Sequence, residues 1–190
     1  MRKRTAGLLL ATVTALPLHA NDFEASMRDY LESEVLLWAF DPQILAAVRA
    51  QNSAHEGLSQ DQILTLDGQW RAEVGTPNEP MVDAVTKTPL ADFLRDRMAG
   101  SGGIVTEIFV MDDKGLNVAA TGATSDYWQG DEGKFTETYG KGVGAVHVGE
   151  VEFDDSAQTY QGQISVSVAD PATRELLGAL TVGLNAEMLY

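Results

Sequence analysis

The feature that most constrains this chain is a change in hydrophobic spacing at Gly100-Ser101-Gly102-Gly103. Before this glycine-rich segment, apolar residues recur every three to four positions, as on the buried face of a helix. After it, apolar residues alternate with polar ones, as in a strand with one buried face. The sequence therefore predicts a helical part over residues 21–103 and a sheet part over residues 104–190, within one domain.

The first helix is predicted over residues 22–40, where Phe23, Met27 and Leu31 share one face. Asp41-Pro42 interrupts it, because Asp is a good N-cap and Pro fits the first turn of a new helix. The second segment is expected to run to about residue 52. The pattern leaves open whether this is one kinked helix or two helices in line.

Two further helical stretches precede the glycine-rich segment. Ser59 is the predicted cap of a short helix, which Gly68 is expected to break. A second helical face runs over residues 81–98, with Pro89 near a helix start. These stretches complete the helical part.

The sheet part is predicted to contain five strands joined by hairpins. Asp113-Lys114-Gly115 is a tight turn, since Gly readily adopts positive φ. A long polar, aromatic loop over residues 124–144 separates the second strand from the third. Helices followed by hairpins favour an α+β fold, with long N-terminal helices and then an antiparallel sheet. The predicted strands are residues 104–112, 116–121, 147–153, 160–169 and 176–184.

The N-terminus resembles a secretory signal peptide. Arg2-Lys3-Arg4 is followed by an apolar run over residues 8–16 that is too short to span a bilayer. Cleavage is expected after Ala20, which makes residues 1–20 the signal peptide and predicts a periplasmic location without membrane insertion of the mature chain.

Composition excludes several classes of function. The 190 residues contain no cysteine, so disulfides, thiolate metal sites and cysteine nucleophiles are absent. The formal charge is −15, and an acidic surface of this kind repels nucleic acid and anionic lipid. Neither is therefore expected as a partner.

The motifs of catalysis and metal binding are missing or incomplete. His19, His55 and His147 show no metal-ligand spacing, and no serine lies in a nucleophile elbow. The stretch over residues 112–117 superficially resembles a calcium loop but lacks the regular ligand spacing, and a hairpin turn explains it. No catalytic residue, metal or cofactor is predicted. Asp131 with Glu132 leaves a small carboxylate-dependent hydrolase as an alternative.

Binding of a small molecule is the best-supported function. Tyr127 and Trp128 are adjacent aromatics in a polar loop, and aromatic side chains form rigid walls for small ligands. The alternative is that Trp128 packs against the sheet and the charges are solvated, while Trp38 and Trp70 are interpreted as packing residues. The predicted ligand-binding residues are Asp126, Tyr127, Trp128, Lys134, Gln163, Ser165, Ser167 and Asp170.

The sheet part resembles the extracytoplasmic Cache sensor domains, also called PDC domains, which have a PAS-like sheet after a long helix. The resemblance covers residues 104–185. Its most specific stretch is Asp126-Tyr127-Trp128-Gln129-Gly130-Asp131-Glu132, and the strands add residues 108–115, Asp154, and residues 165–170 and 177–183.

The resemblance implies a single Cache module that binds an amino acid or organic acid between the sheet and the long loop, near Tyr127, Trp128 and Asp170. The Arg-x-Trp-Tyr pattern of amino-acid-binding two-module receptors is missing. The printed chain ends at Tyr190 without a second helix or output domain, so signalling through a membrane-bound sensor protein is expected. A homodimer through the N-terminal helix is a further expectation. The competing interpretation is an interaction module with an empty pocket.

Overall fold

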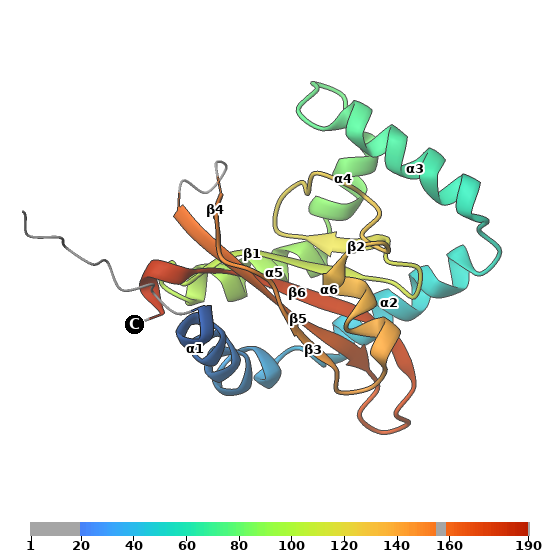
Figure 1. The fold of residues 1–190 in the computed structure, drawn as a ribbon. Helices are drawn as coiled ribbons and strands as arrows, with labels where there is room; N and C mark the ends of the chain where they lie inside the picture. Colours follow the sequence, from blue (N-terminus) through green and yellow to red (C-terminus); the bar gives the residue numbers. More distant parts are fainter. Residues whose placement is uncertain (1–19, 155–158, 190) are drawn as a thin grey trace, which may run out of the picture.

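The computed structural model describes residues 20–154 and 159–189 (Figure 1). The predicted signal peptide, up to residue 19, lies outside the described residues. None of the described helices is long and apolar enough to cross a membrane.

The N-terminal helical part separates into more helices than the sequence predicted. The first predicted helix is α1 (Ala20–Ser33) with the 3₁₀ turn η1 (Val35–Leu37), and α2 (Pro42–His55) is a separate helix. The side chain of Asp41 accepts a hydrogen bond from the backbone N–H of Gln43 and caps α2, as predicted. The structure thus settles the open alternative in favour of two helices.

Gly68 does not break α3 (Gln60–Glu73), which was predicted as a short helix. A capping box between Ser59 and Gln62 fixes the start of α3, and buried Trp70 packs the stretch beyond the glycine. The stretch predicted as one helical face divides into α4 (Pro80–Thr86) and α5 (Pro89–Gly100). Thr88 caps α5 and Pro89 occupies its first turn, which is why a new helix begins there.

Within the described residues the sheet is antiparallel and has six strands, not the predicted five. Its order is β2-β1-β6-β5-β3, and β4 pairs separately with β5. The single strand predicted over residues 147–153 is two short strands, because residues 149–151 between them have no regular strand pairing, although the N–H of Gly149 still donates to the carbonyl of Gln163 at 2.8 Å. The bounds are β1 (Val105–Met111), β2 (Asn117–Ala120), β3 (Val146–Val148), β4 (Glu152–Asp154), β5 (Thr159–Ala169) and β6 (Leu176–Asn185).

The two faces of the sheet have different covers. The apolar residues of β1, β5 and β6, among them Ile108, Ile164 and Val182, pack against α1, α2 and α5 in the larger core. The alternate residues face the opposite side, toward the loop over residues 121–145 that contains α6 (Gly133–Thr136) and η2 (Tyr139–Lys141). Helices on one face and an irregular loop on the other are the α+β arrangement that the sequence predicted.

A second, smaller core lies where α3 and α4 meet the β1–β2 end of the sheet. Figure 1 shows α3 and α4 beyond the β2 edge, away from α1. We call the buried residues of this second core the α3 cluster: Ile63, Trp70, Val82, Val85, Phe109, Met111, Leu116, Ala120, Tyr127, Phe135 and Ala179.

Candidate functional site

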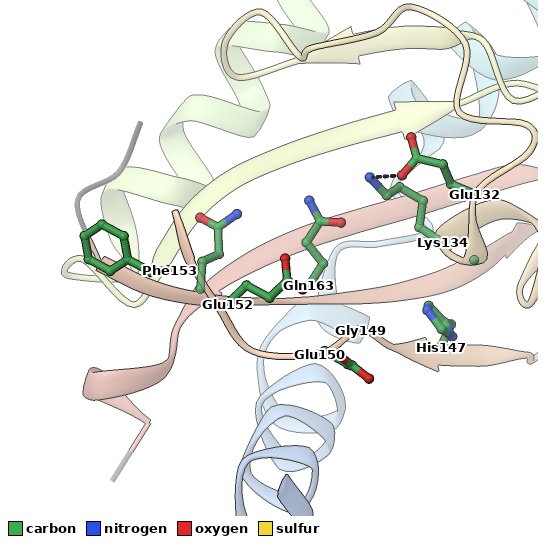
Figure 2. Close-up of a pocket in the computed structure, with 10 residues that line it drawn as sticks. Glu132, Lys134, His147, Gly149, Glu150, Glu152, Phe153 and Gln163 are labelled. Carbon is green, nitrogen blue, oxygen red and sulfur yellow. Dashed lines mark ion pairs between the residues drawn. The ribbon is translucent and has the colours of Figure 1, made fainter. Parts of the chain in front are cut away.

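A pocket of about 490 Å³ lies on the sheet face opposite α1, between β5, the β3–β4 edge and the start of α6. We call it the sheet-face pocket. Figure 2 shows its lining extending along β5, from Phe153 at one end to Glu132 and Lys134 at the other. The lining residues are Glu132, Gly133, Lys134, His147, Gly149, Glu150, Glu152, Phe153, Gln161 and Gln163.

The floor of the sheet-face pocket is organised by one carboxylate. Oε1 of Glu107, on β1, accepts hydrogen bonds from Nε2 of Gln161 at 2.6 Å and Nε2 of Gln163 at 2.8 Å. Gly183 of β6 lies between them, and a Cβ there would lie 2.6 Å from Cγ of Glu107 and 3.0 Å from Cδ of Gln161. Only glycine leaves room for this bridge across three strands.

Lys134 lies at the other end of the pocket and is already paired. Its Nζ is 3.0 Å from Oε2 of Glu132 and donates to Oε1 of Gln129 at 3.2 Å. The ammonium also lies 5.4 Å from the centre of the Phe109 ring, within cation–π range. Lys134 therefore joins the pocket to the edge of the α3 cluster.

The structure brings Lys134 and Gln163 together, but it places the two predicted aromatics elsewhere. Among the described residues, neither Tyr127 nor Trp128 lines the sheet-face pocket. Tyr127 is buried and stacks on Trp70, with ring centres 5.5 Å apart. Burial, and secondarily the charge of Asp112, raises the pKa of Tyr127. Trp128 is half-buried, and its Nε1 donates to the backbone carbonyl of Lys114 at 2.8 Å.

Residues of α3 hold the aromatic loop in this position. Oδ1 of Asp67 accepts from the backbone N–H groups of Tyr127 at 2.9 Å and Trp128 at 3.1 Å, and Arg71 pairs with Oδ2. Nε1 of Trp70 donates to the carbonyl of Thr124 at 2.8 Å. Sequence reasoning missed Asp67, because nothing local distinguishes a buried carboxylate on α3 from a solvated one. It did interpret Trp70 correctly as a packing residue.

The other predicted residues also have protein partners. Ser165 is buried and shares a hydrogen bond with Thr181 at 2.9 Å, and buried Ser167 accepts from the N–H of Gly144 at 2.9 Å. Oδ1 of Asp126 lies 3.4 Å from a guanidinium nitrogen of Arg71. A ligand-binding role for these residues stays a prediction.

Asp170 ties the far end of β5 to α2. Its Oδ2 accepts from Arg49 at 2.6 Å, and its Oδ1 accepts from the N–H groups of Ala172 and Thr173 in the β5–β6 turn. The Arg49 hydrogen bond, aided by the two backbone bonds, lowers the pKa of Asp170 to about 2. Asp170 is therefore a charged anchor of the framework.

Most residues that line the pocket were missed by sequence reasoning. Gln161 shares the alternation of Gln163, so the polar face of the β5 sequence does predict it. Glu150 and Glu152 were not predicted, since the division of this strand into β3 and β4 was not foreseen. Glu107 gave a weak signal as a lone acidic residue among apolar ones in β1.

Asp112, in the stretch that resembles a calcium loop, serves the β1–β2 hairpin instead. Its Oδ1 accepts from the N–H groups of Lys114 and Leu116, each at 2.9 Å. Its Oδ2 accepts from Gln51 at 3.0 Å and lies 2.8 Å from Nδ1 of His55. Within the described ranges, no group of three or more His, Asp or Glu side chains could hold a metal ion.

A second hollow, of about 790 Å³, lies between α1 and the β3–β4 connection. We call it the α1 groove. Phe23 and Met27 of α1 form one wall, and Val151 and Tyr160 belong to the other. It shares Gly149 and Glu150 with the sheet-face pocket, so this short connection separates the two hollows.

Comparisons with known proteins return structures only. No family model matches the chain. No curated protein matches it either. The similar solved structures include the sensor domain of the histidine kinase DctB from V. cholerae, at 13% identity and a TM-score of 0.44, which covers 90% of this chain and 57% of that one.

Two chemoreceptor domains are also similar. The sensory domain of Tlp3 from Campylobacter jejuni has 11% identity and a TM-score of 0.40, and covers 88% of this chain and 65% of that one. The ligand-binding domain of the amino-acid chemoreceptor PctC from Pseudomonas aeruginosa, in complex with GABA, has 13% identity and a TM-score of 0.38, and covers 86% and 62%. The chain thus spans less than two thirds of each.

The similar structures are sensor domains of histidine kinases and chemoreceptors, the class of the Cache resemblance in the sequence. Their identities to this chain are at most 13%, and their TM-scores are below 0.5.

Proposed function

We propose that this protein is a periplasmic sensor domain that binds a small organic molecule in the sheet-face pocket. The observation that carries the proposal is the pocket itself, with about 490 Å³ of space and polar side chains from several elements. Pockets of this size suit small metabolites, and a few convergent polar groups give specificity. The ligand classes expected from the sequence resemblance are amino acids and organic acids.

The floor of the pocket is preorganised, which supports binding without a large conformational cost. The Glu107 bridge fixes Gln161 and Gln163 before any ligand arrives. Side chains held in this way lose little rotamer entropy on binding. The α6 end, where Lys134 and Glu132 lie on the irregular loop, is the part that a ligand would order.

The route for a signal is the thin wall between the two hollows. Gly149 and Glu150 line the sheet-face pocket on one side and the α1 groove on the other. Met27 of α1 lies directly on β5, since a Cβ at Gly162 would be 2.9 Å from its Sδ. We propose that occupancy of the pocket shifts α1 relative to the sheet, and that a membrane-bound sensor protein reads this shift.

Thermal-shift screening of the purified protein tests the proposal. A panel of amino acids, organic acids and amines should contain compounds that raise the melting temperature, as binding to the folded state alone requires. The Gln163→Leu variant should lose this response while Leu37→Ala, at an exposed position of η1, keeps it. A flat response across the whole panel would contradict the proposal.

A further inference from the structure

The hydrogen-bonding direction of the pocket floor indicates which ligand groups it accepts. A carboxylate can only accept hydrogen bonds, so Glu107 turns the NH₂ groups of both Gln161 and Gln163 toward itself. Oε1 of Gln161 then accepts from the hydroxyl of Thr106. Oε1 of Gln163 accepts no hydrogen bond from any described residue, which leaves a fixed acceptor on a residue that lines the pocket. Such a floor requires a donor on the ligand.

Lys134 does not offer the pocket a free positive charge. Its ammonium is held by Glu132 and Gln129 and lies over Phe109, and its side chain is only 16% exposed. An anionic ligand would have to compete with the Glu132 carboxylate at 3.0 Å for the same ammonium. The pairing makes Lys134 a poor receiver for a second carboxylate.

The rim of the sheet-face pocket carries further negative charge. Glu150 and Glu152 are exposed, line the pocket, and form no ion pair within the part of the chain that the structure describes. Together with Glu132 they outnumber Lys134, the lysine of the lining. A concave surface with an excess of one charge concentrates ligands of the opposite charge and repels those of the same charge.

Building on the proposed function, we infer that the ligand of the sheet-face pocket is a small organic cation that carries an ammonium or guanidinium group. The cationic group donates to Oε1 of Gln163 and lies near the carboxylate of Glu132, while Glu150 and Glu152 attract it from the rim. Organic acids without an amine are excluded by the same charges. This narrows the class expected from the sequence to amine-bearing ligands with a net positive charge.

Three probes with the same carbon chain separate charge from shape: cadaverine with two ammonium groups, δ-aminovalerate with one ammonium and one carboxylate, and glutarate with two carboxylates. Isothermal titration of the purified protein should rank cadaverine first and glutarate last, at least about tenfold apart, as expected from charged hydrogen bonds. Added salt should weaken cadaverine binding, because the rim charges are exposed.

Two variants and a control test the assigned contacts. Gln163→Leu should weaken cadaverine binding at least about tenfold, because the ammonium loses its fixed acceptor. Lys134→Gln should tighten cadaverine binding, by up to about fivefold, since it removes a like charge from the pocket and frees Glu132. Glu32→Gln, an exposed carboxylate of α1 outside the pocket lining, should change nothing. Circular dichroism checks that each variant is folded.

The outcomes are distinguishable. If glutarate or δ-aminovalerate binds more tightly than cadaverine, the cation inference is overturned and the sensor proposal stands. Loss of glutarate binding in Lys134→Gln would assign an anion site to the lysine and also overturn it. If none of the three probes binds, and the wider panel is silent as well, both the inference and the proposed function fail together.

Discussion

The α3 cluster and the sheet-face pocket lie on the same side of the sheet, yet the side chains that form them differ in polarity. The α3 cluster is apolar and closed, and the buried carboxylate of Asp67 beside it accepts hydrogen bonds from backbone N–H groups of the aromatic loop. The pocket is polar and open, with amides and carboxylates from β1, β4, β5 and the α6 loop. Adjacent aromatics in a polar loop therefore need not mark a ligand site, because they can equally close a core.

The comparison predicts that changes in the α3 cluster affect stability and changes in the pocket affect binding. The largest expected effect is that of Trp70→Ala. Trp70 is fully buried, stacks on Tyr127 and donates to the carbonyl of Thr124, so its loss should lower the free energy of unfolding by about 4 kcal/mol. Urea denaturation measures this. Leu37→Ala, at a residue that is 78% exposed, is the control and should cost less than about 0.5 kcal/mol. Equal urea midpoints for the two variants would contradict the claim that the α3 cluster determines stability.

Asp67→Ala should have the next largest effect on the free energy of unfolding. It leaves the buried N–H of Tyr127 and the half-buried N–H of Trp128 without an acceptor and should cost about 3 kcal/mol. Arg71→Ala removes only the exposed partner and should cost clearly less, so the pair separates the buried hydrogen bonds from the ion pair. The same denaturation curves give both values. A larger effect of Arg71→Ala would show that the ion pair, and not the backbone hydrogen bonds, fixes the loop.

Gln163→Leu tests the sheet-face pocket and should change the stability of the fold only slightly. Gln161 continues to donate to Glu107, so the free energy of unfolding should fall by no more than about 1 kcal/mol. The proposed ligand response should nevertheless disappear. Denaturation and thermal shift with cadaverine, measured on one preparation, separate the two readouts. A loss of stability comparable to that of Trp70→Ala would place Gln163 in the framework and remove the contrast.

The smallest expected effect is a change in thermal stability at acidic pH. Because the pKa of Asp170 is lowered to about 2, its carboxylate stabilises the folded state above the ordinary value of 3.8, and this contribution is lost as the pH falls toward 2. Asp170→Asn should therefore melt at a lower temperature than the natural protein near neutral pH. The difference should shrink between about pH 4 and pH 2. Melting curves over this range test it, and a difference independent of pH would mean that Arg49 does not discriminate the charged form.

Parts of the site could be predicted where local chemistry decides them. The alternation in β5 placed Gln163 on a polar face, and the loop position placed Lys134 beside it. The aromatic pair could not be assigned in the same way, because its neighbours, Asp67 and Trp70, lie far earlier in the chain. Glu107 likewise acquires its role only when β1 and β5 flank Gly183 of β6.

What the sequence determined by itself is the α+β class, the helix caps at Asp41 and Ser59, the tight turn before β2 and the buried Trp70, because spacing and local hydrogen bonding decide these features. What only the tertiary structure decided is the division of the β3–β4 edge, the closure of Tyr127 under α3 and the bridge from Glu107 to two glutamines. These depend on contacts between segments distant in the chain, and a sequence pattern records which residues prefer burial but not which partner buries them.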